Sequence, residues 1–280
     1  MNRTDRMNPA SGVLVLLWAS ACCFAQGSPA PAGEQGGSGE LLPVRLEFSA
    51  YGSHVDRGYG DWRGLQGQLW IRANPYFVPV FFYDSQTRPG GTQQNYAFFS
   101  YANWSKWFYT TQGFSYAPER PLSATFFPKK RYDVKGHWKL PPKGNVVLGA
   151  GYTRVDWGGP GHAQIFNAGL LYYRRKLVVE GNAFVNRNQP GGLVSGAGSL
   201  AVQYGREGSY WFGATAGGGR ELYRVQLVTP ADIRLSSYSA TIFYRKWLSR
   251  HFGFVMTFDF QEKLNAYRRA GGAAGLFFEF

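Results

Sequence analysis

From Val44 onward, apolar and polar side chains alternate with a period of two residues. Between Arg131 and Leu140 the odd positions read Arg, Asp, Lys, His and Lys, and the even positions read Tyr, Val, Gly, Trp and Leu. Between Phe252 and Gln261 four of the five even positions are Phe. Successive side chains of a β-strand point to opposite faces, whereas a helix repeats every 3.6 residues. The alternation therefore predicts an all-β chain.

Composition indicates which face of these strands lies outside. Aromatic residues make up 18% of the chain and charged residues only 17%, against about 25% charged residues in an average soluble domain. The second face is mostly Gly, Ser, Thr, Ala, Asn and Gln rather than the Lys- and Glu-rich surface of a soluble β-sandwich or lipocalin-like barrel, which is the alternative. An apolar band outside and a polar interior are typical of an outer-membrane barrel.

The N-terminal segment predicts export. Arg3 and Arg6 precede the apolar run 13–19, and small residues around Ala25 form a cleavage site, so we expect residues 1–25 to be a signal peptide. Both cysteines lie in this segment, which leaves none in the mature chain. Residues 26–43 are rich in Gly, Pro, Ala and Ser and are interpreted as a flexible periplasmic segment. The barrel is expected over residues 44–280.

The lengths of the connectors predict the topology. In order, the expected connectors are 54–61, 74–75, 85–92, 103, 118–130, 141–144, 156–163, 174–175, 188–193, 206–207, 218–233, 247–250 and 262–269. Odd ones are long and even ones short, as when one mouth carries extracellular loops and the other periplasmic turns. This predicts a transmembrane antiparallel up-and-down β-barrel of 14 strands with both termini in the periplasm. Because 76–84, 93–102 and 104–117 are aromatic at both parities, their faces stay unassigned and 12 strands remain an alternative.

Charged residues fall into two groups. On strands with clear alternation, ten nearly balanced charges are expected to line the lumen: Arg45, Glu47, Arg72, Arg131, Asp133, Lys135, Lys139, Glu180, Arg245 and Asp259. Most of the net charge of +13 falls on connectors instead. Five basic residues of the expected extracellular loops are candidates for binding lipopolysaccharide phosphates or acidic glycans: Arg120, Lys129, Lys130, Arg268 and Arg269.

The last strand ends the chain on an aromatic residue. Phe280, Phe278 and Leu276 share one parity. An apolar alternation that ends in a terminal Phe resembles the signal by which the barrel assembly machinery recognises outer-membrane barrels. We therefore expect these three residues to act in assembly.

A family resemblance rests on three elements. They are Ser123-Ala-Thr-Phe-Phe-Pro-Lys129, Gly149-Ala-Gly-Tyr152 and the terminal Phe280. Together they resemble the YaiO-type outer-membrane barrels over roughly residues 45–280. The resemblance implies an outer-membrane barrel associated with envelope or exported glycans, and it implies no catalytic residues.

No catalytic or cofactor motif appears in the sequence. It contains no H-E-x-x-H, P-loop or G-x-S-x-G pattern, and the four histidines are interpreted as lumen and loop residues. We therefore expect no catalytic residues, no metal and no cofactor, and export excludes a nucleic-acid partner. The leading hypothesis is a non-enzymatic narrow channel or export conduit for anionic or glycan substrates. The alternatives are an enzyme acting on lipid or lipopolysaccharide, and a structural barrel whose basic loops bind lipopolysaccharide or a partner.

Overall fold

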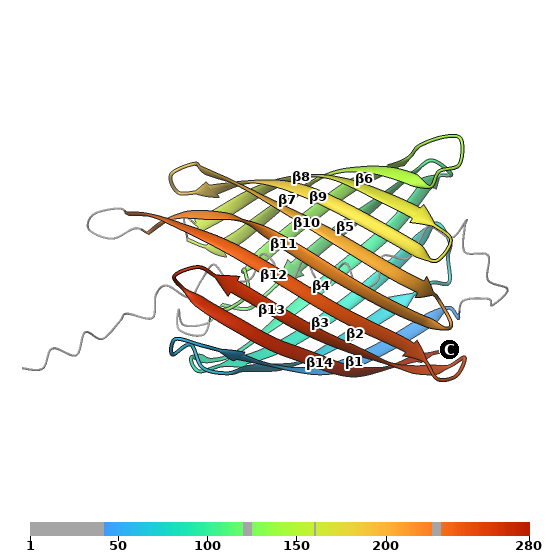
Figure 1. The fold of residues 1–280 in the computed structure, drawn as a ribbon, viewed down its shortest axis with the longest axis horizontal. Helices are drawn as coiled ribbons and strands as arrows, with labels where there is room; N and C mark the ends of the chain where they lie inside the picture. The colour runs from blue at the N-terminus through green and yellow to red at the C-terminus, as the bar shows by residue number, and fades with distance from the viewer. Residues whose placement is uncertain (1–41, 120–124, 160, 226–230) are drawn as a thin grey trace, which may run out of the picture.

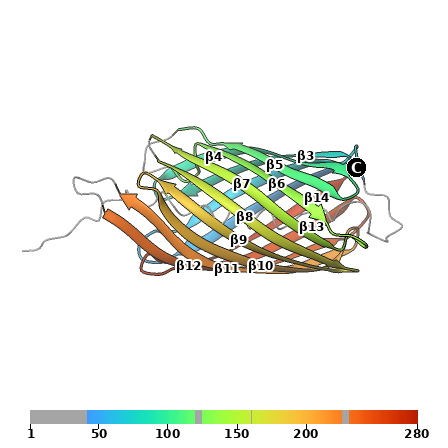
Figure 2. The same cartoon turned by 90° about the horizontal axis from the view of Figure 1, so that it is seen from above.

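A computed structural model describes residues 42–119, 125–159, 161–225 and 231–280. These residues form a single closed barrel of antiparallel strands, each paired with its neighbours in sequence (Figures 1 and 2). The strands are β1 (Val44–Val55), β2 (Trp62–Ile71), β3 (Phe77–Arg88), β4 (Gly91–Ser105), β5 (Phe108–Tyr116), β6 (Lys130–Lys139), β7 (Val146–Gly158), β8 (Gly161–Arg174), β9 (Leu177–Gln189), β10 (Leu193–Arg206), β11 (Tyr210–Val225), β12 (Ala231–Trp247), β13 (Phe252–Lys263) and β14 (Tyr267–Glu279). The prediction of a 14-strand up-and-down barrel is confirmed, and the 12-strand alternative is wrong.

The first and last strands close the barrel. β1 pairs with β14 from Arg45 opposite Glu279 to Val55 opposite Arg269. The backbones of Val44 and Phe280 exchange two hydrogen bonds of 3.0 Å. Closure leaves no open sheet edge. We call the end where β1 begins and β14 ends the proximal rim and the opposite end the distal rim. The expected signal peptide and most of the segment 26–43 lie outside the described residues.

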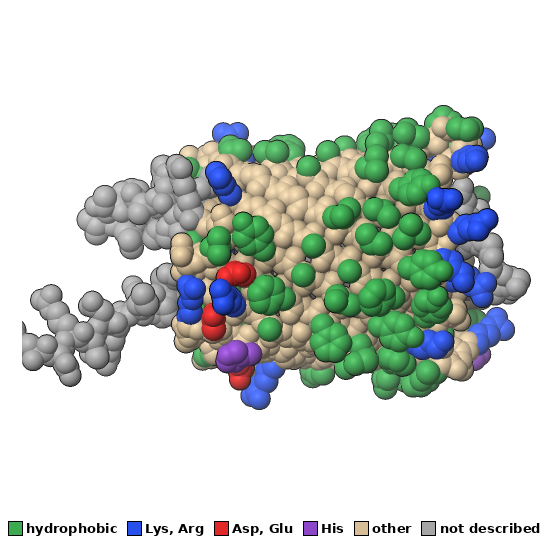
Figure 3. Space-filling view, in the orientation of Figure 1, with side chains coloured by type: hydrophobic (Ala, Val, Ile, Leu, Met, Phe, Trp, Pro, Cys, Tyr) green, Lys and Arg blue, Asp and Glu red, His purple; other side chains and the backbone are tan. Residues whose placement is uncertain are grey.

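The outer wall carries the apolar side chains (Figure 3). Tyr132, Val134, Trp138 and Phe258 are 45–61% exposed, while Asp133, Lys135, Thr257 and Asp259 of the opposite parity line the interior. No helix in the described part of the chain is long and apolar enough to cross a membrane.

The strands with rings at both parities carry aromatic side chains on both walls. Phe81 and Tyr96 are 46% and 50% exposed outside, whereas Phe82, Phe99 and Tyr101 line the interior. Parity alone could not orient β3 and β4, because the lumen as well as the outer wall is aromatic there.

The predicted alternation of long and short connectors is wrong. The expected loop 85–92 is mostly strand, since β3 continues to Arg88 and β4 begins at Gly91. β11 and β12 likewise extend through most of the expected loop 218–233. β12 has 17 residues, well beyond the roughly ten that cross the hydrocarbon. Polar strand ends continue the hydrogen-bonded ladder outside the apolar band, so a polar composition does not mark where a barrel strand stops.

Two residues that precede β6 pack into the distal mouth. Phe126 and Phe127 are buried, and their backbone N–H groups both donate to Oε1 of Gln93, at 2.5 and 2.8 Å. The guanidinium of Arg88 lies 3.7 Å from the ring centroid of Trp62 and 4.6 Å from that of Phe126. The Phe126–Phe127 pair, which we call the distal plug, therefore occupies part of the lumen at this end.

Candidate functional site

Two adjoining cavities lie inside the barrel. Cavity A has a volume of about 180 Å³ and is lined mainly by β1–β4 and β12–β14. Cavity B has a volume of about 250 Å³ and is lined mainly by β4–β11. Phe99, Tyr101 and Arg131 line both, so the cavities meet at these side chains. Phe127 of the distal plug borders cavity A.

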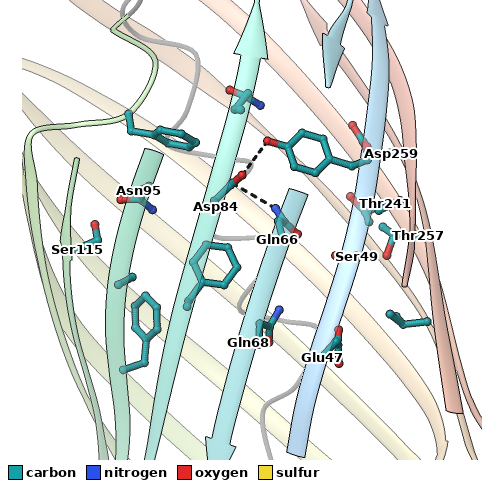
Figure 4. Close-up of a pocket in the computed structure, with 18 of the residues that line it drawn as sticks. Glu47, Ser49, Gln66, Gln68, Asp84, Asn95, Ser115, Thr241, Thr257 and Asp259 are labelled. Carbon is teal, nitrogen blue, oxygen red and sulfur yellow. Dashed lines mark hydrogen bonds between the residues drawn. The ribbon is translucent and has the colours of Figure 1, made fainter. Parts of the chain in front are cut away.

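Neutral polar side chains outnumber charged ones in both linings. Those of cavity A, several of which point into it in Figure 4, are Ser49, Ser53, Gln66, Gln68, Gln86, Asn95, Ser115, Ser239, Thr241, Thr257 and Gln261. Those of cavity B are Ser100, Thr111, Gln112, Thr153, Asn167, Asn182, Asn186, Ser199 and Thr215. Aromatic rings interrupt this polar surface. The lumen thus offers many hydrogen-bonding dipoles and apolar faces, and few formal charges.

An ion network packs the lumen at the proximal rim. Arg45 pairs with Glu207 and donates from Nε to Oε1 of Glu279 at 2.6 Å. Arg72 reaches the same Glu207 oxygen at 3.2 Å. Arg245 donates to Oε2 of Glu47 at 2.7 Å. Four lumen residues expected from the sequence therefore meet in one buried network.

Glu207 belongs to this network although the sequence places it in a turn. It lies between β10 and β11 and its side chain is only 17% exposed. Burial would raise the pKa of Glu207, but Arg45 and Arg72 outweigh that effect and hold the pKa at about 2. Sequence reasoning missed this residue because its inward direction depends on arginines more than 130 positions away.

The charges around cavity B are also paired. Arg131 donates from Nε to Asp133 at 2.8 Å. Nζ of Lys135 lies 3.6 Å from the carboxylate of Glu180 and donates to Oδ1 of Asn182 at 2.9 Å. Nearer the proximal rim, Nζ of Lys139 lies 5.9 Å from the ring centroid of Tyr109.

Several expected loop residues lie on strands and have acidic partners. Lys130 begins β6, and Arg268 and Arg269 are the second and third residues of β14. Arg269 points into the lumen, where it pairs with Asp259 at 2.9 Å. Arg268 pairs with Glu262 at 2.8 Å, and Lys129 pairs with Glu119. The predicted loop positions of Lys130, Arg268 and Arg269 are therefore wrong, because β6 and β14 extend further than their composition indicated. Arg120 lies outside the described residues.

A group of cations without acidic partners among the described residues lies at the proximal rim. Seven basic side chains on or beside its turns are exposed: Lys106, Lys143, Arg174, Arg175, Lys176, Arg206 and Arg250. None forms an ion pair with a described residue, and the one acid in the described turns here is the inward-pointing Glu207. Figure 3 shows Lys and Arg along this edge and mixed charges toward the distal edge.

Asp84 is a further lumen residue that the sequence did not reveal. It is 7% exposed and lines cavity A. The hydroxyl of Tyr51 donates to Oδ1 at 2.9 Å, and Nε2 of Gln66 donates to Oδ2 at 3.3 Å (Figure 4). It was missed because β3 could not be oriented. The sequence did contain a signal for the inner face of β3, because both of its charged residues, Asp84 and Arg88, share the parity of Phe82.

Comparison with known proteins identifies the family. The model of a family described as "YaiO membrane beta barrel domain" matches residues 44–224. The chain belongs to this family. The resemblance seen in the sequence is thereby confirmed, and the YaiO barrel described above is a membrane barrel of the outer-membrane type. No curated protein matches it in sequence.

Solved structures share the fold at low sequence identity. The "CymD monoaromatic hydrocarbon channel" superposes with a TM-score of 0.54 at 8% identity, covering 86% of this chain and 89% of that chain. OpdQ of Pseudomonas aeruginosa has a TM-score of 0.49 at 9% identity, with coverages of 85% and 98%. At such identities the likeness concerns the fold alone.

The histidines of this YaiO-family barrel lie in separate places. His137 stacks on Tyr109 with ring centroids 4.4 Å apart and lies 3.3 Å from Oγ1 of Thr111. The exposed His54 lies 2.8 Å from Asp61. Within the described ranges, no histidine has both an acid and a hydroxyl partner, and no cluster of three His, Cys, Asp or Glu side chains could hold a metal ion.

The C-terminal residues of the barrel lie on its outer wall. Phe280, Phe278 and Leu276 are 59%, 41% and 46% exposed. Phe278 faces the ring of Phe252 on β13, with centroids 5.4 Å apart. These side chains form an apolar stripe beside the β1–β14 seam, which is accessible from the membrane side.

Proposed function

We propose that this protein is a narrow, partly occluded outer-membrane channel for small, uncharged, hydroxylated solutes such as sugars, and that it is not an enzyme. The single observation that carries the proposal is the lining of cavities A and B. Ser, Thr, Asn and Gln side chains outnumber charged side chains in both linings, and Tyr and Phe rings lie between them. Hydroxyl and amide groups exchange hydrogen bonds with sugar hydroxyls, and rings offer apolar faces to sugar C–H surfaces.

Charge pairing supports an uncharged solute over an anionic one. Arg45, Arg131, Arg245 and Lys135 each have a carboxylate within 4 Å. A paired cation attracts a passing anion less than a free one does, because its partner cancels most of the field. The arginines that line the two cavities in the described part of the chain, Arg131, Arg245 and Arg269, are therefore all paired, unlike the free arginines expected of an anion pathway.

The orientation and partners form part of the same proposal. We place both chain termini, and with them the proximal rim, in the periplasm, since the distal rim carries the longer β5–β6 connector. The apolar stripe at Phe280, Phe278 and Leu276 then serves as the site that the barrel assembly machinery reads. Lipopolysaccharide contacts the distal outer wall.

Solute entry into liposomes tests the channel. Purified protein in proteoliposomes should admit glucose faster than maltotriose, and planar bilayers should show small conductance steps with little preference between K⁺ and Cl⁻. Protein-free liposomes, and liposomes with heat-unfolded protein, are the controls. Glucose entry no faster than in these controls would reject the channel.

A second role is favoured by the proximal rim. Its seven exposed cations have no acidic partner among described residues, and phosphate groups suit both Arg and Lys. This rim is proposed to hold anionic phospholipid headgroups of the periplasmic leaflet. Arg174→Gln, Arg175→Gln and Lys176→Gln together should reduce the extra thermal stability of the barrel in phosphatidylglycerol nanodiscs compared with phosphatidylcholine nanodiscs. An equal lipid preference in both proteins would exclude this role.

A further inference from the structure

Asp84 differs from the other acids of the lumen in having no cationic partner. Glu47 and Asp259, which also line cavity A, pair with Arg245 and Arg269. Among described residues no Lys, Arg or His lies within ion-pair distance of Asp84, and its two hydrogen-bond donors, Tyr51 and Gln66, are neutral. A buried carboxylate without a counter-charge is costly, and a cationic ligand removes that cost.

Arg88 acts on Asp84 electrostatically but forms no ion pair with it. It lies on the same face of β3, but its guanidinium is held between Trp62 and Phe126, and its Nε donates to Gln86 at 2.9 Å. These contacts keep it beside the distal plug, on the far side of Gln86 from Asp84. The carboxylate of Asp84 is left facing cavity A (Figure 4).

A second acceptor lies next to Asp84. Asn95 on β4 is the direct cross-strand partner of Asp84, so the two side chains stand side by side on the inner wall. Oδ1 of Asn95 is buried and has no hydrogen-bond partner. The amide oxygen of Asn95 thus lacks a donor, and the carboxylate beside it, although it accepts two hydrogen bonds, lacks an ion-pair partner among the described residues. A primary ammonium has three donors, one positive charge and no acceptor, and so complements this pair better than a hydroxyl, which brings no charge.

Aromatic rings and a glycine complete the site. Tyr51, Phe82 and Phe99 line the same cavity, and ring faces attract cations. Tyr51 reaches Asp84 by crossing Gly64 of β2, where a methyl group would overlap the Tyr51 hydroxyl and the carbonyl oxygen of Ser85. The missing side chain at Gly64 therefore permits the hydrogen bond that orients the carboxylate.

We propose that Asp84, Asn95 and Tyr51 form a binding site within the lumen for a small organic molecule that carries a primary ammonium group. The site rests on the proposed channel only in that a ligand must reach the lumen. It adds a preference for amines to a path otherwise suited to neutral polar solutes. A sugar amine and a simple alkanolamine share the recognised group.

Calorimetric titration of the full-length protein in detergent micelles tests the site with three small probes. Ethanolamine carries the charge and the N–H donors, choline the charge without N–H donors, and ethylene glycol only hydroxyls. Ethanolamine should bind at least about tenfold more tightly than the other two, because charge-assisted hydrogen bonds are involved. Asp84→Asn should weaken ethanolamine by a similar factor, whereas Glu262→Gln, an equal charge change on the outer surface, should not.

A second variant, which is expected to bind ethanolamine more tightly, keeps the test valid if Asp84→Asn fails to fold. Asn95→Asp places a second carboxylate beside Asp84 and should tighten ethanolamine binding. Equal binding of all three probes, or unchanged binding by both variants, would overturn the site. Glucose entry into liposomes separates this result from the channel. If glucose enters the liposomes but ethanolamine binds no more tightly than the other probes, the channel is supported and the amine site is rejected. If ethanolamine binds preferentially but glucose does not enter, the amine site is supported and the channel is rejected.

Discussion

The Glu47–Arg245 pair provides a direct measure of what the proximal network contributes to stability. Both side chains are buried, at 4% and 6% exposure, and their charged atoms are 2.7 Å apart. Removing one partner of a buried pair costs about 3–5 kcal/mol, since the other charge stays buried. Glu47→Gln keeps the volume and one hydrogen-bond acceptor, so we expect a loss near the lower end, about 3 kcal/mol.

Glu262→Gln is the matched control. Its partner Arg268 is 61% exposed, and such pairs contribute below about 1 kcal/mol. Urea-dependent folding into lipid bilayers, followed by tryptophan fluorescence, gives both free energies of unfolding. The double variant Glu47→Leu, Arg245→Met should recover most of the lost stability, because it removes both buried charges. Equal small losses in Glu47→Gln and Glu262→Gln would refute the view that this network is a buried, coupled unit.

Three further perturbations address the plug, the network and assembly. Phe126→Ala with Phe127→Ala should empty part of the distal mouth and raise single-channel conductance; unchanged conductance would place the narrowest point elsewhere. The pKa of Glu207 is about 2 in the fold against an ordinary 4.5, so its stabilisation is complete above pH 4.5 and is lost as the pH falls toward 2. Melting temperatures of wild type should therefore fall over this range more than those of Glu207→Gln. Deleting Phe280 should slow membrane insertion in cells, measured as the yield of heat-modifiable barrel, and an equal yield would make this residue incidental.

The barrel itself could be predicted from sequence because its signal is local. Each strand between Arg131 and Gln261 shows which residues share a face, and composition tells which face meets lipid. Alternation and composition could not assign the faces of β3 and β4, because aromatic rings lie on both walls there, as Phe81 and Phe82 show. For this reason Asp84 was not predicted to face the lumen.

The candidate site depends on pairings that no local pattern contains. Asp84 meets Asn95 through the β3–β4 register. It meets Tyr51, two strands away, across Gly64 of the strand between them. Glu207 enters the lumen only because Arg45 and Arg72 attract it there. Strand ends were also misplaced, since the hydrogen-bonded ladder continues where the apolar alternation has already faded.

Net charge illustrates why a total is a poor guide to a barrel. A sum of +13 suggests an anion pathway, yet the lumen places Arg45, Arg245 and Lys135 beside carboxylates and leaves Asp84 unpaired. Many of the surplus cations stand at the proximal rim, outside the lumen. A solute in cavity A therefore meets neutral dipoles, aromatic rings, paired charges and the unpaired carboxylate of Asp84, while a headgroup at the rim meets unpaired cations. Since salt screens charges over about 8–10 Å, we expect substitutions at the rim to change the proposed headgroup binding and substitutions of Asp84 to change the proposed amine binding, each without affecting the other.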